Sequence, residues 1–205
     1  MGTITEPGQI KLLGFAGHRA VLDPAGLRKT LIGELAEMKA LLGNRMTAIC
    51  SAAAGADLIF LRACVELRIP AIVILPFPEE RFAEDFEDKE EWQLARHLTG
   101  VALAKYVTPG GKEAPEAYHE VSRHLLDWAD AFLFAWDGKE PRGTGGTGET
   151  VREARELGIP SRIIDAEILE ARWEIALDAG RKARHGFDTR VDLLDFLDAR
   201  FATDF

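Results

Sequence analysis

A glycine- and threonine-rich segment toward the end of the chain has the residue types that bind an anion. It follows an apolar run at 131–136 and precedes a helical pattern at 151–158. Glycines let backbone N–H groups approach a ligand closely, and a helix N-terminus adds partial positive charge. Threonine hydroxyls and an arginine can donate further hydrogen bonds to a phosphate. The residues expected to bind a ligand here are Arg142, Gly143, Thr144, Gly145, Gly146 and Thr147. A flexible loop with a helix cap would use the same residue types.

Two other polar turns follow apolar runs that are predicted strands. In the first, Gly14 and Gly17 allow a tight turn, while His18 and Arg19 place a titratable ring and a permanent cation at the strand end. An ion pair with an acidic surface residue is the alternative explanation of that cation. The second turn, Ser51–Asp57, leads into a helical pattern. Because both turns follow strands, we expect them to meet at one edge of a sheet.

Two carboxylates, Asp57 and Glu149, could take part in chemistry at that edge. Each lies at the start of a predicted helix, where a carboxylate can also be a simple cap. If the protein is an enzyme, either could serve acid–base chemistry at a glycosidic carbon. Outside the glycine-rich segment, the residues expected to contact a ligand are Gly14, Gly17, His18, Arg19, Ser51, Gly55, Asp57, Pro76 and Glu149.

The elements that must position these residues alternate between strands and helices, which indicates an α/β, Rossmann-like three-layer fold with a mostly parallel central sheet. The predicted strands are 10–15, 47–50, 71–75, 101–107, 131–136 and 161–164. One predicted helix follows the Ser51–Asp57 turn and reaches Arg68, and the others are 24–42, 79–97, 118–128, 147–157, 166–179 and 191–201. We expect residues 1–205 to form a single nucleotide-binding domain with a C-terminal helical extension at about 166–205.

Charge and composition restrict the partners. The formal net charge of −9 repels a phosphate backbone on average, so nucleic acid is not an expected partner, whereas a small anion in one focused pocket is compatible. Cys50 and Cys64 form no CxxC pattern and are expected to be buried free thiols of a cytoplasmic protein. No apolar run is long enough to span a membrane, so no membrane partner is expected. The histidines lack zinc-like spacing, and no metal or cofactor is predicted.

Taken together, the turns resemble those of the SLOG superfamily, the Rossmann-like group that includes the LONELY GUY phosphoribohydrolases and the Smf DNA-processing proteins. The Ser51–Asp57 turn is similar to the Ser-Gly-x-Ala-x-Gly-Ile-Asp turn of the DNA-processing proteins, shortened by one residue. The other matching segments are 14–19, 75–78, 85–86, 136–138 and 142–147. The resemblance implies a nucleotide-type ligand across the carboxyl edge of the sheet, with phosphate on the glycine turns. Members range from nucleotide hydrolases to sensors of nucleotide signals, often in bacterial defence.

The sequence departs from the hydrolase pattern of this group. LONELY GUY enzymes carry Pro-Gly-Gly-x-Gly-Thr-x-x-Glu, whereas alignment on Gly145-Gly146-x-Gly148 places Glu149 at the threonine and Arg152 at the glutamate. The resemblance therefore favours a ligand-sensing module that binds a small-molecule nucleotide, with a homo-oligomer or an effector protein as partner. The alternative is a nucleotide N-glycosidase that releases a free base. DNA binding, as in the Smf proteins, is disfavoured by the acidic charge unless a basic stripe exists.

Overall fold

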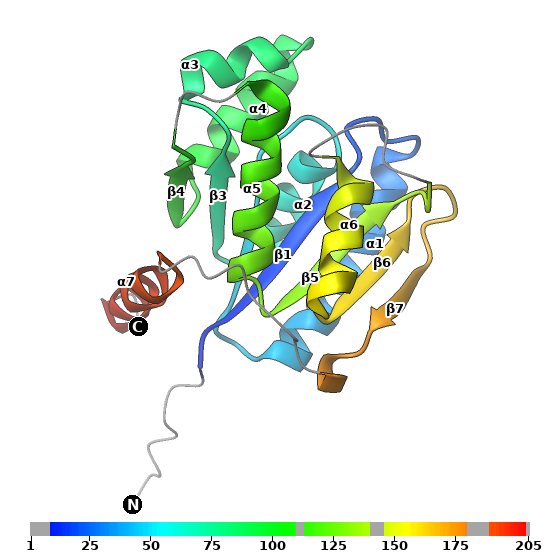
Figure 1. Ribbon diagram of the computed structural model, residues 1–205, viewed down its shortest axis with the longest axis vertical. Helices are drawn as coiled ribbons and strands as arrows, with labels where there is room; N and C mark the ends of the chain where they lie inside the picture. The colour runs from blue at the N-terminus through cyan, green and yellow to red at the C-terminus, as the bar shows by residue number, and fades with distance from the viewer. Residues whose placement is uncertain (1–8, 110–112, 140–145, 180–188, 204–205) are drawn as a thin grey trace, which may run out of the picture.

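A seven-stranded sheet with helices on both faces forms the body of the protein in this computed structural model (Figure 1). The structure describes residues 9–109, 113–139, 146–179 and 189–203. The strand order is β4-β3-β2-β1-β5-β6-β7. All neighbouring strands are parallel except β6 and β7, which are antiparallel. The strands are β1 (Lys11–Gly17), β2 (Met46–Cys50), β3 (Ala71–Leu75), β4 (Ala104–Val107), β5 (Ala131–Trp136), β6 (Ser161–Asp165) and β7 (Ala171–Ile175). The predicted fold class is confirmed.

Helices cover the two faces because neighbouring apolar residues of each buried strand point to opposite sides of the sheet. In β1, Leu13 packs in one core cluster and Leu12 in the other. The first cluster lies under α1, α2 and α4, and the second lies under α5, α6 and α7. These helices are α1 (Pro24–Leu42), α2 (Ala56–Glu66), α4 (Lys89–Gly100), α5 (Ala114–Trp128), α6 (Thr147–Leu157) and α7 (Thr189–Thr203).

The strand order reverses direction at β1, which positions a ligand site. The chain adds β2, β3 and β4 on one side of β1 and then returns to place β5 on the other side. The connections after β1 and β5 therefore run to opposite faces of the sheet, as α1 and α6 show in Figure 1. Such a switch point opens a crevice at the carboxyl ends of the two strands.

The helix predicted at 79–97 is divided in the structure. A short helix α3 (Glu79–Phe82) and a 3-10 turn (Ala83–Asp85) precede Phe86, whose backbone is extended at φ −104° and ψ 122°. Helix α4 then begins anew after Asp88, whose side chain accepts a hydrogen bond of 2.7 Å from the Glu90 N–H. The acidic composition is typical of helices, but this N-cap starts a second helix rather than extending the first.

The helix predicted at 166–179 is wrong, so the proposed C-terminal extension at 166–205 is not helical throughout. After β6, the Asp165 carboxylate accepts hydrogen bonds from the N–H groups of Glu167 and Ile168, at 2.9 and 3.2 Å. Leu169 adopts a positive φ of 59°, and the chain reverses into β7. The antiparallel partner and this turn outweigh the helix propensity of the alanines and glutamates in the segment.

Helix α7 confirms the helix predicted at 191–201. Its Leu197 is fully buried in the second core cluster. The Arg45 guanidinium, which follows α1, donates a 2.7 Å hydrogen bond to the Asp198 carboxylate. Within the residues that the structure describes, no helix is both long enough and apolar enough to cross a membrane.

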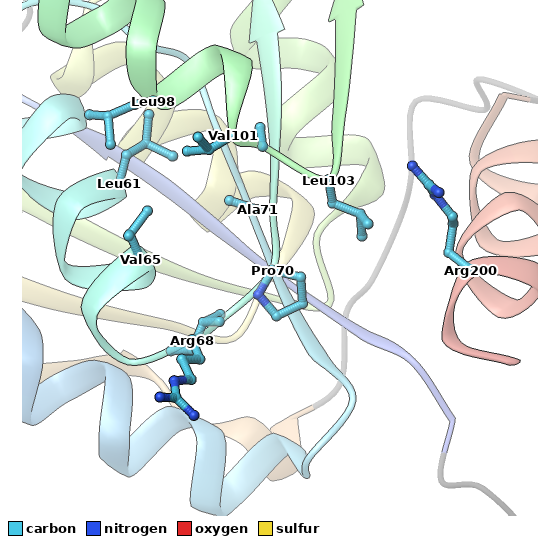
Figure 2. A pocket seen from close by; sticks show the side chains of 11 residues that line it. Leu61, Val65, Arg68, Pro70, Ala71, Leu98, Val101, Leu103 and Arg200 are labelled. Atoms are coloured by element: carbon cyan, nitrogen blue, oxygen red, sulfur yellow. The ribbon is translucent and has the colours of Figure 1, made fainter. Parts of the chain in front are cut away.

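An apolar pocket of about 410 Å³ lies between α2 and α4 at the amino end of β3 (Figure 2). Leu61, Val65, Leu98 and Leu103 line it, and Arg200 of α7 approaches from the other side. It lies at the amino ends of the strands, whereas the polar turns singled out in the sequence lie at the carboxyl ends.

Candidate nucleotide-binding cleft

A cleft of about 590 Å³ lies at the carboxyl ends of β1 and β5, where the strand order switches. Segments distant in the sequence form its walls: the turn after β1, the turn after β2, one side of α5, the end of β5 and the start of α6. Its lining includes seven of the predicted residues, namely Gly17, His18, Arg19, Ser51, Asp57, Gly146 and Thr147.

The turns after β1 and β2 are packed directly against each other. The Ala56 N–H donates a 3.0 Å hydrogen bond to the carbonyl of His18. Gly55 has φ 86°, and a Cβ on it would lie 2.0 Å from the carbonyl oxygen of Arg19. A Cβ on Gly17 would lie 2.5 Å from the Cβ of Ala56. These two glycines are therefore required for the approach of the turns to each other, which in turn places Arg19 at the cleft.

Asp57 is buried on the floor of the cleft, and burial raises its pKa to about 7. Three groups oppose this rise: the Ala53 N–H, which donates a 3.3 Å hydrogen bond to the carboxylate, the Arg19 charge and the Gly17 backbone. Desolvation exceeds them because an ionised carboxylate loses most of its hydration there. Ser51 is buried beside the cleft, and its Oγ has no hydrogen-bond partner among the described residues.

Arg19 is held at the cleft by an aromatic ring. Its guanidinium lies 4.9 Å from the ring centroid of Tyr118, an arrangement that favours a cation. The Tyr118 hydroxyl donates a 2.6 Å hydrogen bond to Asp85, which also accepts one of 2.8 Å from Arg81. Burial and the bond to Asp85 raise the pKa of Tyr118 well above its ordinary value, so it remains a phenol at neutral pH.

His18 faces the end of β5. Its Nε2 lies 3.0 Å from Oδ1 of Asp137 and 3.2 Å from the Asp137 backbone nitrogen. Burial raises the pKa of Asp137, but the Lys139 N–H, His18 and the Lys139 ammonium outweigh it and hold that pKa below its ordinary value. Lys139 also donates a 2.7 Å hydrogen bond to Glu167. The Lys139 ammonium thus lies against both carboxylates of this wall.

The N-terminus of α6 supplies backbone donors to the cleft. Gly146 is its N-cap residue, and no side chain among the residues that the structure describes caps the helix. Thr150 is buried, and its hydroxyl lies 3.2 Å from both the Ser122 hydroxyl and the Gly146 carbonyl, which fixes the first turn against α5. An uncapped helix N-terminus carries about half a positive charge and is suited to an anion.

The structure separates several predicted residues from the cleft. Gly14 lies within β1, where a Cβ would come 2.3 Å from the ring of Phe132, so this glycine serves sheet packing. Pro76 follows β3 and its carbonyl accepts a 3.0 Å hydrogen bond from Thr108. Neither lines the cleft. The predictions for Arg142, Gly143, Thr144 and Gly145 lie outside the described residues.

Glu149 also lies away from the cleft lining, on the side of α6 that faces α5. It is 3.3 Å from Arg152 and 3.6 Å from His119. Conversely, Tyr118, Asp137 and Lys139 line the cleft but were not among the residues expected to contact a ligand, although Asp137 lies in the matching segment 136–138. Asp137 and Lys139 directly follow a predicted strand, a position that could have identified them.

Comparison with known proteins supports a likeness of fold. No protein-family model matches the chain, and no curated protein matches it. DNA processing protein A from Streptococcus pneumoniae superposes with a TM-score of 0.55 at 17% identity, over 78% of this chain and 52% of that one. The chain thus spans about half of that protein. The Helicobacter pylori protein of the same name, described as having a unique single-stranded DNA binding mode, gives a TM-score of 0.53 at 13% identity, over 95% of this chain and 81% of that one.

These similarities overturn two expectations. The main function predicted from the sequence, a module that senses a small-molecule nucleotide, is wrong, because two structures that match are DNA processing proteins. The exclusion of nucleic acid as a partner is wrong for the same reason, since one match binds single-stranded DNA. That exclusion averaged the charge over the whole chain, whereas binding depends on the charges close to the site. The predicted resemblance is confirmed at the level of architecture: the chain has the Rossmann-like fold of DNA processing protein A.

Proposed function

We propose that this protein binds single-stranded DNA and that the cleft holds one nucleotide of the strand. The observation that carries the proposal is that Arg19 and the N-terminus of α6 line the same cleft. A phosphate between them would accept charge-assisted hydrogen bonds from the guanidinium and from backbone N–H groups of α6. The similar fold of the single-stranded DNA binding protein from Helicobacter pylori favours DNA among phosphorylated ligands.

The net charge of −9 does not prevent this binding. At physiological ionic strength, charges more than about 8 Å apart are largely screened, so the distant acidic surface contributes little. Near the cleft, the Lys139 ammonium lies 3.4 Å from the Asp137 carboxylate and 2.7 Å from the Glu167 carboxylate. Asp57 has a pKa of about 7 and is therefore largely uncharged below neutrality. Arg19, Lys139 and the α6 dipole therefore supply positive potential at the cleft.

The cleft also offers surface to an unpaired base. Leu22, which is 82% exposed, lies at its mouth, and Tyr118 and Trp136 contribute to its walls. Bases of a single strand can enter such an apolar recess, whereas bases of a duplex remain stacked and paired. Contacts of this kind depend little on base identity, so we expect a preference for single strands with weak sequence selectivity.

Fluorescence anisotropy with a labelled thymidine oligonucleotide tests the proposal. The wild type should bind the single strand more tightly than a duplex of equal length, and binding should weaken as salt is raised. Arg19→Ala should weaken binding about tenfold or more, because a charge-assisted hydrogen bond contributes about 1.5–3 kcal/mol. Arg19→Lys keeps the positive charge but loses the paired donors of the guanidinium. Its affinity for the oligonucleotide should therefore lie between those of the wild type and Arg19→Ala.

Arg96→Ala is the matched control, since Arg96 is an exposed arginine of α4 outside the cleft. It removes the same charge and should leave the affinity within about twofold of wild type. A thermal melt of each variant verifies folding. Equal losses in Arg19→Ala and Arg96→Ala would refute the assigned site. Absence of single-strand binding, or equally tight binding of a free mononucleotide, would refute the function.

A further inference from the structure

Three metal-ligating side chains meet between α5 and α6, outside the lining of the cleft. His119 comes from α5, and Glu149 and Glu153 come from one face of α6, four residues apart. His119 Nδ1 lies 3.6 Å from Glu149 Oε2 and 3.7 Å from Glu153 Oε1. One donor atom from each of the three residues lies within 4.8 Å of the others. All three residues are half-buried rather than exposed.

The separations are too long for hydrogen bonds but suit ligands of a shared ion. An N–H···O bond is normally about 2.7–3.2 Å. Around a tetrahedral cation with bonds of about 2.0–2.2 Å, by contrast, two ligand atoms lie about 3.4 Å apart. His119 Nδ1 and Glu153 Oε2 are buried and have no hydrogen-bond partner among the described residues. Buried polar atoms are rarely left in this condition without a ligand or water.

Neighbouring contacts orient the cluster. Arg152 binds Oε1 of Glu149 at 3.3 Å, which leaves Oε2 directed toward His119. Outer contacts of this kind commonly fix the orientation of a metal-binding carboxylate. The 3.2 Å hydrogen bond from the Thr150 hydroxyl to the Ser122 hydroxyl joins α6 to α5 one residue beyond Glu149. The three side chains are therefore supported from two helices that are already joined.

We propose that His119, Glu149 and Glu153 bind a divalent transition-metal ion, with Zn²⁺ as the best match. One imidazole and two carboxylates are ligands that Zn²⁺ accepts, and the imidazole makes Mg²⁺ or Ca²⁺ a poor fit. Three protein ligands leave a fourth position for water. The ion would join α5 to α6, and Tyr118 and Gly148, which adjoin two of its ligands in sequence, line the cleft. The site would thus stiffen two walls of the cleft without contacting DNA.

Titration of the chelator-treated full chain with Zn²⁺ tests this, with calorimetry and a thermal melt as readouts. We expect one high-affinity ion per chain and a rise in Tm with Zn²⁺. His119→Gln and Glu153→Gln should each lower the affinity at least about tenfold, because even loss of an outer contact costs about 10–100-fold in metal sites. The Tm rise should be lost in both.

His97→Gln and Glu156→Gln are the controls, since both residues are exposed and outside the cluster. They should bind Zn²⁺ as the wild type does. Melts without metal verify that the variants fold. If the wild type binds no Zn²⁺, or if the cluster variants bind it as well as the controls do, the three residues form an ion-pair group and the proposal is wrong. Neither readout uses DNA, so the result stands apart from the proposed function.

Discussion

Gly55→Ala should destabilise the protein by about 3 kcal/mol or more, which corresponds to a fall in Tm of about 6–12 °C for a chain of this size. Gly55 has φ 86° and ψ −123°, a conformation that is costly for any residue with a side chain. The new Cβ would also lie 2.0 Å from the carbonyl oxygen of Arg19 and 2.6 Å from its carbonyl carbon. These are backbone atoms, so no rotamer change can relieve the contact.

The effect should extend to DNA binding. Relief of the contact requires the turn after β2 to move away from the turn after β1, which would break the 3.0 Å hydrogen bond between Ala56 N–H and the His18 carbonyl. Arg19 adjoins His18, so its guanidinium would be displaced from the cleft. Even at temperatures where the variant remains folded, oligonucleotide affinity should therefore fall.

Gly33→Ala is the matched control, measured by the same thermal and chemical melts. Gly33 lies within α1, and a Cβ there would meet no atom within 4 Å. Alanine favours helix more than glycine does, so this variant should gain about 0.5–1 kcal/mol. Equal stabilities for the two variants would show that the turns do not depend on Gly55.

The sheet was predictable because its strands are continuous apolar runs. Residues 71–75 and 131–136 are wholly apolar, and a parallel sheet covered on both faces requires such runs. The C-terminal segment was less predictable. Ala171, Trp173 and Ile175 fit an alternating strand pattern, but the neighbouring alanines and glutamates fit a helix equally well. The choice depended on the Asp165 turn and on pairing with β6, neither of which local composition specifies.

The candidate site was predictable only where its residues directly follow strands. His18 and Arg19 follow β1, and the parallel sheet brings them to the edge shared by β5 and α6. Tyr118 could not be predicted, since it reaches Arg19 from α5, about a hundred residues along the chain. Glu149 was expected at the ligand because it adjoins the glycine-rich segment. Successive helical residues point about 100° apart, however, and this rotation directs Glu149 toward His119.

Asp57→Asn should make the protein less sensitive to alkaline pH. Burial raises the pKa of Asp57 from 3.8 to about 7 in the folded protein, so between these values the folded state holds a proton that the unfolded state has released. Stability contributed by this group is therefore present at low pH and is lost as pH rises through about 7. A shift of about 3 pKa units corresponds to about 4 kcal/mol.

Asparagine cannot ionise, so the stability of Asp57→Asn relative to wild type should rise by up to about 4 kcal/mol between pH 4 and pH 8. Chemical melts across this range measure the difference directly, and any pH-independent cost of the amide cancels. Asp192→Asn, at an exposed position of α7, is the control, and its stability difference from wild type should stay level across the same pH range. Parallel curves for Asp57→Asn and wild type would mean that Asp57 is ionised at neutral pH, and the cleft would then present a negative charge to the phosphate proposed to bind there.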